Sequence, residues 1–283
     1  MTAPAERDGI VADFLREHDR DRYLASLVLP QARRAPIQAL YAFAAEIAAV
    51  RERVSEPAPG EIRLQWWTDA LSGEGHGSVR ANPVADALLS AIGEYGLPTV
   101  PLLRLIAARR FDLYDDPMPD LPTFEGYAGE TVSVLFQYAA MILNDGQPVE
   151  PGDAAGHLGV ANALVGHLRA FGHMSSRGRI MLPLAMLTAN GVSEHEIFSG
   201  TPSEGLAEAH GQFVGLARLH LDKAETAIRA LPTPLRPAFA QIAVLRRQLA
   251  LVERQAGSPF AAPADLADWR KIAVLAGWRL RRG

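Results

Sequence analysis

The sequence predicts a single all-α domain, and three observations support this prediction. Apolar residues recur at helical spacing over long stretches, as in Ile37, Leu40, Ala44 and Ile47. Proline and glycine separate these stretches, and we find no convincing run of alternating apolar and polar residues that would indicate a strand. Hydrophobic residues make up 48% of the 283 residues and charged residues 21%, which is the balance of a folded globular chain.

The elements follow from this pattern in chain order. Residues 1–20 are rich in Asp, Glu and Arg and lack the apolar core of a signal peptide, so we expect a partly disordered N-terminal segment before a domain over residues 21–283. Two apolar stripes predict long helices around residues 37–54 and 158–168. Further helices are expected over residues 83–95, 101–114, 124–143, 206–230, 237–255 and 266–281. The longest loops are expected around residues 55–60, 115–122 and 257–263, which are rich in proline or glycine.

Composition excludes several classes of function. The net charge of −4 provides no basic field for nucleic acid, so we expect no nucleic-acid partner. The absence of cysteine excludes disulfides, thiolate zinc sites and a cysteine nucleophile. No apolar stretch reaches the ~18 residues of a membrane span. We therefore expect a cytoplasmic protein whose membrane contact is peripheral, at the inner face of the membrane.

Two clusters of polar residues suggest chemistry, but simpler interpretations are favoured. Pro117, Pro119 and Pro122 preclude a regular helix through residues 116–120. For the acidic cluster of Asp112, Asp115, Asp116 and Asp120, a solvated acidic loop is therefore expected in place of a metal site. No His-x-x-x-His pair occurs, and no zinc is predicted. The C-terminal segment around Trp269 reads as a basic amphipathic helix, which either docks by its apolar face or lies on an anionic membrane.

Three groups of residues together resemble the squalene/phytoene synthase superfamily. Residues 23–30 (Tyr-Leu-Ala-Ser-Leu-Val-Leu-Pro) continue to residues 39–43 (Ala-Leu-Tyr-Ala-Phe). Residues 62–67 read Ile-Arg-Leu-Gln-Trp-Trp. Residues 158–161 (Leu-Gly-Val-Ala) continue to residues 177–183 (Arg-Gly-Arg-Ile-Met-Leu-Pro). The resemblance covers nearly the whole chain and implies an isoprenoid-synthase-like helical bundle with a central cavity.

The resemblance also implies where metal would bind in an active member of the superfamily. There, two helices each carry aspartates four residues apart, and side chains at this spacing share a helix face and hold Mg²⁺ against the diphosphates of the substrate. In this sequence the matching positions are Ala48 and Glu52 on one helix and Ala170 and Met174 on the other. Since only one of the four is a carboxylate, we expect no metal site, no cofactor and no catalytic residues at these positions.

Other residues match positions at or near which the superfamily binds diphosphate. The candidates for binding a phosphate or another ligand are Arg33, Arg34, Tyr41, Arg169, Arg177 and Arg179. Arginine suits phosphate because its planar fork donates two hydrogen bonds at once. A prenyl or lipid phosphate held without metal is therefore a candidate ligand, while pairing of these arginines with local acids or helix ends is the alternative.

Within the superfamily, the chain is similar to a catalytically degenerate subfamily that includes mitochondrial respiratory complex I assembly factors. The residues that indicate this are 46–50 (Glu-Ile-Ala-Ala-Val), 54–56 (Val-Ser-Glu) and 167–169 (His-Leu-Arg). The leading hypothesis is a non-catalytic binding or assembly protein, with a subunit of a respiratory complex as a candidate partner. The alternatives are an active head-to-head prenyltransferase that uses Glu52 and Mg²⁺, and a carrier of a prenyl or acyl lipid.

Overall fold

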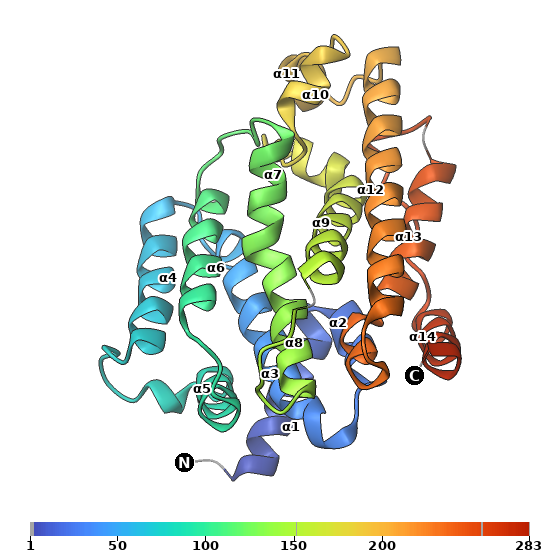
Figure 1. Ribbon diagram of the computed structural model, residues 1–283. Coiled ribbons are helices and arrows are strands. Elements are labelled where there is room, and N and C mark those ends of the chain that lie inside the picture. Colours follow the sequence, from blue (N-terminus) through green and yellow to red (C-terminus); the bar gives the residue numbers. More distant parts are fainter. Residues whose placement is uncertain (1–2, 151, 256, 283) are drawn as a thin grey trace.

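The computed structural model describes residues 3–150, 152–255 and 257–282, and within these ranges the chain forms helices and no strand (Figure 1). The α-helices are α1 Pro4–His18, α2 Arg20–Ser26, α3 Gln31–Ala48, α4 Pro57–Ser72, α5 Pro83–Tyr95, α6 Val100–Arg109, α7 Leu121–Ala128, α8 Val134–Leu143, α9 Gly152–Ser175, α10 Leu184–Ala189, α11 Glu194–Ser199, α12 Glu204–Ala230, α13 Ile242–Arg254 and α14 Asp268–Arg282. Short 3-10 turns are η1 Arg51–Arg53, η2 Val79–Ala81, η3 Arg110–Leu113 and η5 Thr233–Phe239, and η4 Gly129–Ser133 is a π turn. The predicted all-α class is confirmed.

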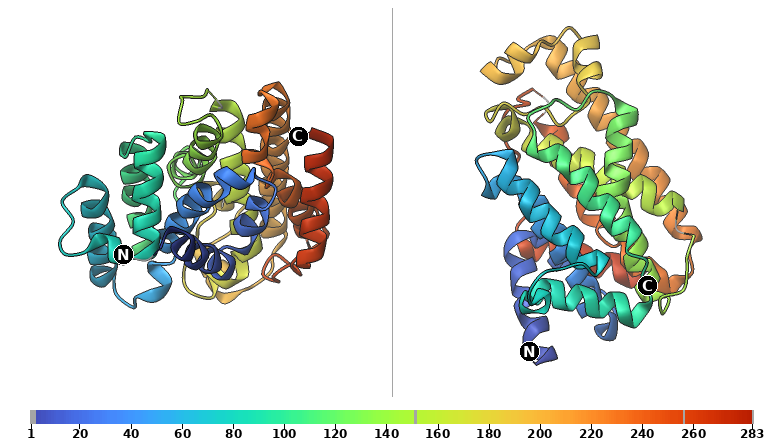
Figure 2. Two further views of the ribbon diagram at one scale, coloured as in Figure 1. Left: turned by 90° about the horizontal axis from the view of Figure 1, so that it is seen from below. Right: turned by 90° about the vertical axis from the view of Figure 1, so that its left-hand side faces the viewer.

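The two longest helices, α9 and α12, lie side by side in the middle of the bundle. Helix α3 packs against α1, α5 and α8. Helix α13 packs against both α9 and α12, and α14 packs against α13 and α2. Seen from below, α4 and α5 lie at one edge of the molecule and α14 at the opposite edge (Figure 2). Large aromatic side chains fill the interior: Phe43, Phe124, Phe136, Tyr138, Phe213 and Phe239 are all fully buried. Their burial supplies much of the hydrophobic stabilisation of the bundle.

A π turn joins α7 and α8 into one continuous helix at the point where α9 crosses it. A Cβ atom added at Gly159 of α9 would lie 2.0 Å from the Oγ atom of Ser133 and 2.7 Å from its backbone nitrogen. Only glycine therefore permits the observed distance between the two backbones. The extra residue of a π turn shifts the register of a helix, which brings the backbone of Ser133 against α9.

This crossing predicts the effect of one methyl group. We expect Gly159→Ala to lower the free energy of unfolding by about 1–3 kcal/mol, because the added carbon overlaps backbone atoms that cannot rotate away. Gly166→Ala on the same helix is the matched control, since Gly166 is exposed and an added Cβ would meet no atom within 4 Å. The control is expected to raise stability by about 0.5–1 kcal/mol. Urea denaturation of both variants measures the difference, and equal stabilities would contradict the close crossing.

Five helices lie outside the ranges in which helices were expected: α1, α2, α4, α10 and α11. Residues of the N-terminal segment, which we expected to be partly disordered, form α1, and Val11 and Leu15 on its inner face are buried. Helix α4 begins at Pro57, inside the expected loop over residues 55–60, and ends before Gly73, whose φ of 78° gives a left-handed cap. A proline in the first turn needs no N–H partner, so it starts a helix as readily as it marks a loop.

A search of the described residues for a helix that is long and apolar enough to cross a membrane finds none.

Candidate functional site

The four positions that the resemblance equates with metal-binding aspartates lie at the C-terminal ends of two helices. Ala48 is the last residue of α3 and Glu52 follows in η1, while Ala170 and Met174 belong to the last turns of α9. Of the four side chains, only Glu52 carries oxygen atoms, which Mg²⁺ requires as ligands. Across the described ranges, no three Asp, Glu or His side chains come together as possible metal ligands.

Ion pairs join these two helix ends. Arg177 pairs with the Oε2 atom of Glu52, and the Nη1 atom of Arg179 lies 3.6 Å from its Oε1 atom. The three side chains, together with Arg51 and Val54, line a cavity of about 120 Å³. The carboxylate of Glu52 is therefore neutralised by guanidinium groups of the same chain. Because Glu52 and Arg177 are exposed, these ion pairs contribute little to stability.

Arg179 is the buried member of this group, with 7% of its surface exposed. Its Nη2 atom donates a hydrogen bond of 3.1 Å to the backbone carbonyl of Asp112, and its Nη1 atom lies 4.0 Å from the Sδ atom of Met174. A thioether is a weak hydrogen-bond acceptor, so Met174 binds the Arg179 guanidinium much more weakly than a carboxylate at this position would. The backbone of η3 and the carboxylate of Glu52 hold the guanidinium instead.

A buried polar network lies directly behind Arg179. The carboxylate of Asp112 accepts a hydrogen bond of 2.9 Å from Arg109 and one of 2.7 Å from the hydroxyl of Tyr127. Arg109 also donates to the Tyr127 oxygen over 2.7 Å. The expectation that Asp112 belongs to a solvated acidic loop is wrong, because only 7% of its surface is exposed and Arg109 compensates its charge. Asp115 and Asp116 are exposed, as that interpretation required.

His167 of α9 faces the same network. Burial lowers the pKa of His167 to about 4, and although Asp112 opposes this effect, the positive charges of Arg109 and Arg179 add to it. The imidazole packs edge-on against the ring of Phe124, with 5.9 Å between ring centroids. His167 is therefore neutral at physiological pH.

Two of the predicted ligand-binding arginines lie at the other end of α3. Arg33 donates to the hydroxyl of Tyr95 over 2.7 Å and pairs with Asp145. Arg34 donates to backbone carbonyls of the preceding turn. At about 1.5 Å per residue, Arg34 lies about 21 Å along the helix from Ala48. The structure therefore separates this pair from Arg177 and Arg179.

Tyr41 and Arg169 also lie apart from Glu52. Tyr41 is buried, and burial raises the pKa of its hydroxyl to about 12. The Arg169 guanidinium forms an ion pair of 2.8 Å with Asp265 and lies 3.9 Å from a carboxylate oxygen of Asp21. Of the six candidates for binding a ligand, the structure brings together only Arg177 and Arg179.

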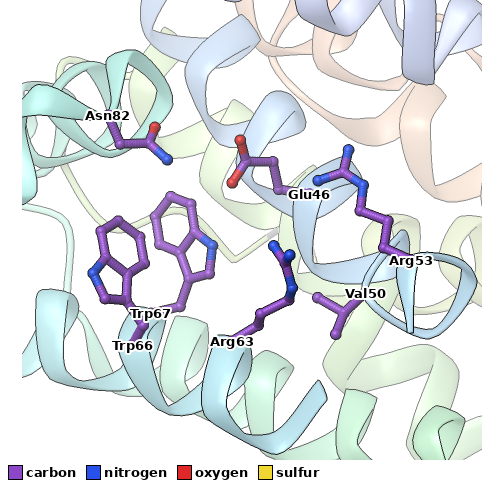
Figure 3. A pocket seen from close by; sticks show the side chains of 7 residues that line it. All are labelled: Glu46, Val50, Arg53, Arg63, Trp66, Trp67 and Asn82. Carbon is purple, nitrogen blue, oxygen red and sulfur yellow. The ribbon is translucent and has the colours of Figure 1, made fainter. Parts of the chain in front are cut away.

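A pocket that the sequence did not predict lies between α3 and α4 (Figure 3). It has a volume of about 230 Å³ and is lined by Glu46, Val50, Arg53, Arg63, Trp66, Trp67 and Asn82. The carboxylate of Glu46 and the guanidinium groups of Arg53 and Arg63 point into one space, beside the indole of Trp67. Burial raises the pKa of Glu46, although Arg53 opposes this effect. Glu46 is two residues from Ala48, about 200° around the helix, so the pocket opens on the side of α3 away from Ala48.

Comparisons with known proteins identify the family of the chain. The family model described as squalene/phytoene synthase matches residues 15–272. The NADH dehydrogenase (ubiquinone) complex I assembly factor 6 of Bos taurus is 30% identical over 247 residues, which covers 87% of this chain and 74% of that protein. The 15-cis-phytoene synthase of Synechococcus elongatus is 28% identical over 269 residues, which covers 89% of this chain and 86% of that enzyme.

Solved structures share the fold. The crystal structure of a dehydrosqualene synthase in complex with a ligand superimposes with a TM-score of 0.82 at 20% sequence identity, and the match covers 98% of this chain and 96% of that one. A squalene synthase from Alicyclobacillus acidocaldarius superimposes with a TM-score of 0.68, also at 20% identity, over 99% and 96% of the two chains. At this level of identity the likeness establishes the arrangement of helices.

Proposed function

Since the chain belongs to the squalene/phytoene synthase family, we propose that it is a non-catalytic member that assists assembly of a respiratory NADH dehydrogenase complex. The similarity to the bovine complex I assembly factor supports this proposal, because it extends over 87% of the chain. The partner is then a subunit of the respiratory complex. The protein works on the cytoplasmic side and contacts the membrane peripherally.

The observation that carries the proposal is the pairing of Glu52 with Arg177 and Arg179. A synthase of this superfamily needs acidic side chains at the two helix ends, because Mg²⁺ must hold the departing diphosphate. Here the single carboxylate is engaged by two arginines, and Ala48, Ala170 and Met174 have no hard oxygen atom. The residues present therefore do not fit a cluster of Mg²⁺ ions.

Packing next to the π turn gives further support. Leu135 and Phe136 of α8 are each 1% exposed, and Phe136 stacks on Phe239 with 6.0 Å between ring centroids. Bulky side chains therefore occupy the interior beside α9, where an elongated prenyl chain would need space. An alternative candidate remains an active head-to-head prenyltransferase, which the 28% identity to a phytoene synthase favours.

Genetic complementation and product analysis test the proposal together. Deletion of the gene is expected to reduce the amount of assembled NADH dehydrogenase, and both the parent protein and a Glu52→Gln variant are expected to restore it. A metal-dependent synthase would lose its function on that substitution. Incubation of the purified protein with farnesyl or geranylgeranyl diphosphate and Mg²⁺ is expected to give no squalene-like or phytoene-like product. Robust product formation that disappears in Glu52→Gln would establish the alternative.

Calorimetry provides a direct measurement of metal binding. We expect no binding of Mg²⁺ at submillimolar concentration, with or without a prenyl diphosphate, because a single carboxylate paired with arginines cannot replace the water ligands of the ion. A phytoene synthase measured under the same conditions serves as the positive control. Strong uptake of Mg²⁺ that depends on the diphosphate would contradict this prediction.

A further inference from the structure

Helix α14 exposes an apolar stripe to solvent. Trp269, Ile272 and Leu280 are 67%, 46% and 88% exposed. Each residue of a helix is rotated by about 100° from the one before it, so these three positions share one face, together with the exposed Ala273 and Ala276. Large apolar side chains gathered on one outer face indicate an interaction surface.

The opposite face of α14 is fastened to the protein. Lys271, Leu275 and Trp278 are 2%, 1% and 5% exposed. The Nζ atom of Lys271 donates to Asp21 of α2 over 2.6 Å and to Asp265 over 2.7 Å. A lysine that is buried and paired in this way fixes the rotation of the helix about its own axis. The apolar stripe therefore points outward. Helix α14 itself lies at the outer edge of the molecule, beside α13 (Figures 1 and 2).

Arginines flank the stripe on both sides. On the helical projection Arg270 and Arg281 lie on one side of it and Arg279 on the other. Among the described residues, the side chains of Arg279 and Arg281 have no hydrogen bond or ion pair, and the guanidinium group of Arg270 contacts only the ring of Trp269, at 5.1 Å. Although the whole chain has a net charge of −4, residues 270–283 contain four Arg besides the paired Lys271, and no Asp or Glu. The surface thus combines an apolar strip with unneutralised positive charge.

A groove between α13 and α14 adjoins one of these flanks. It has a volume of about 290 Å³, and its polar lining consists of Glu225 and the three arginines Arg246, Arg247 and Arg281, beside Trp278. Arg246 is neutralised by Asp222 at 2.9 Å and by Glu225. In the part of the chain that the structure describes, Arg247 and Arg281 have no acidic partner. Two guanidinium groups without an acidic partner, in a groove that a tryptophan also lines, suit a phosphate whose attached chain is apolar.

We propose that the outer face of α14 docks on an anionic lipid bilayer, with a lipid phosphate held between Arg247 and Arg281. An apolar strip with an exposed tryptophan and arginines on both sides is the pattern of a helix that lies in the plane of a membrane interface. The charge on both flanks favours a bilayer, because lipid phosphates surround such a helix on both sides. The outer face of α14 is then the surface that makes the peripheral membrane contact of the proposed function, and the inference rests on the proposed function only in this respect.

Vesicle sedimentation with the full-length protein tests this proposal. Binding is expected to phosphatidylcholine vesicles that contain phosphatidylglycerol, to be weak without the anionic lipid, and to fall as salt is raised. The triple variant Trp269→Ser, Ile272→Ser, Leu280→Ser is expected to lose at least about tenfold in partitioning. Neutralising Arg247 or Arg281 to Gln is expected to cost about fivefold each on anionic vesicles. The matched control, Ile62→Ser, Val100→Ser, Phe198→Ser, changes exposed apolar residues on α4, α6 and α11 and is expected to bind like the parent.

A second readout does not depend on the folding of a multiple variant. Brominated lipids are expected to quench part of the tryptophan fluorescence of the parent protein, and Trp269→Phe is expected to remove that quenching. Unchanged binding by the α14 triple variant, or quenching that survives Trp269→Phe, would overturn the proposal. A third outcome is that the protein binds no vesicle while the α14 triple variant fails in complementation. That result would assign the outer face of α14 to a protein partner and would also overturn the membrane proposal. Because the vesicle assay contains no respiratory subunit, its failure leaves the assembly function untouched.

Discussion

Replacing Asp112 by alanine is expected to lower the free energy of unfolding by about 3–5 kcal/mol. The change removes one partner of a buried ion pair and leaves the guanidinium of Arg109 without its counter-charge at 2.9 Å. It also leaves the buried hydroxyl of Tyr127 without the carboxylate to which it donates over 2.7 Å. Urea denaturation followed by circular dichroism measures the loss. The effect is expected to be large because the carboxylate serves two buried groups at once.

Two comparisons separate the lost charge from the lost side chain. Asp112→Asn keeps the shape and one acceptor, so it is expected to be less destabilising than Asp112→Ala. Asp116→Ala removes an exposed carboxylate from the same acidic segment and is expected to change stability by less than about 0.5 kcal/mol. Equal losses of stability in Asp112→Ala and Asp116→Ala would show that the hydrogen-bond network of Asp112 does not stabilise the protein.

The periodic pattern predicted the long helices well, since their stability depends on a regular apolar face that the sequence displays directly. The expected helix over residues 83–95 is observed as α5, Pro83–Tyr95, with Asn82 accepting hydrogen bonds at its start and Gly96 left-handed at its end. Helix α1 was missed because its inner face buries few apolar residues among many charged ones. Helix α4 was misplaced because Pro57 and Pro59 were interpreted as loop residues.

The site was harder to predict because its contacts join residues that are distant in sequence. The resemblance indicated Glu52, Arg177 and Arg179, yet nothing in the local sequence shows that they form one ion-paired group. Asp112 and Tyr127 belong to different elements, and the acidic, proline-rich neighbourhood of Asp112 resembles a solvated loop. The i, i+3 spacing of Arg109 and Asp112 was the one local signal available. Burial of a charge is a property of the packed structure, so sequence reasoning identifies it poorly.

The stability of the protein is expected to fall on mild acidification, in large part because of His167. Its pKa in the folded protein is about 4, whereas an unperturbed histidine titrates near 6.5. Between these values the unfolded chain binds a proton that the folded protein excludes, so the contribution is complete above pH 6.5 and is lost as the pH falls towards 4. One pKa unit corresponds to about 1.4 kcal/mol, so the loss is on the order of 3 kcal/mol over the full window. About 2 kcal/mol of it is expected by pH 5, before most carboxylates titrate.

Substitution of the histidine isolates this effect. His167→Gln is expected to remove a large share of the decline between pH 6.5 and 5, because glutamine cannot take up a proton in the unfolded chain. The remaining decline is expected to come from two histidines of α12: His220, whose pKa is also lowered to about 4 by burial and by the nearby His157, and His210, whose pKa is lowered by burial. His173→Gln on α9 is the matched control, since His173 is exposed, and it is expected to retain the pH dependence of the parent. Urea denaturation at a series of pH values between 7.5 and 5 measures all three proteins. A decline that is unchanged in His167→Gln would mean that this imidazole is hydrated in the folded protein, and would remove the physical basis for a neutral histidine behind Arg179.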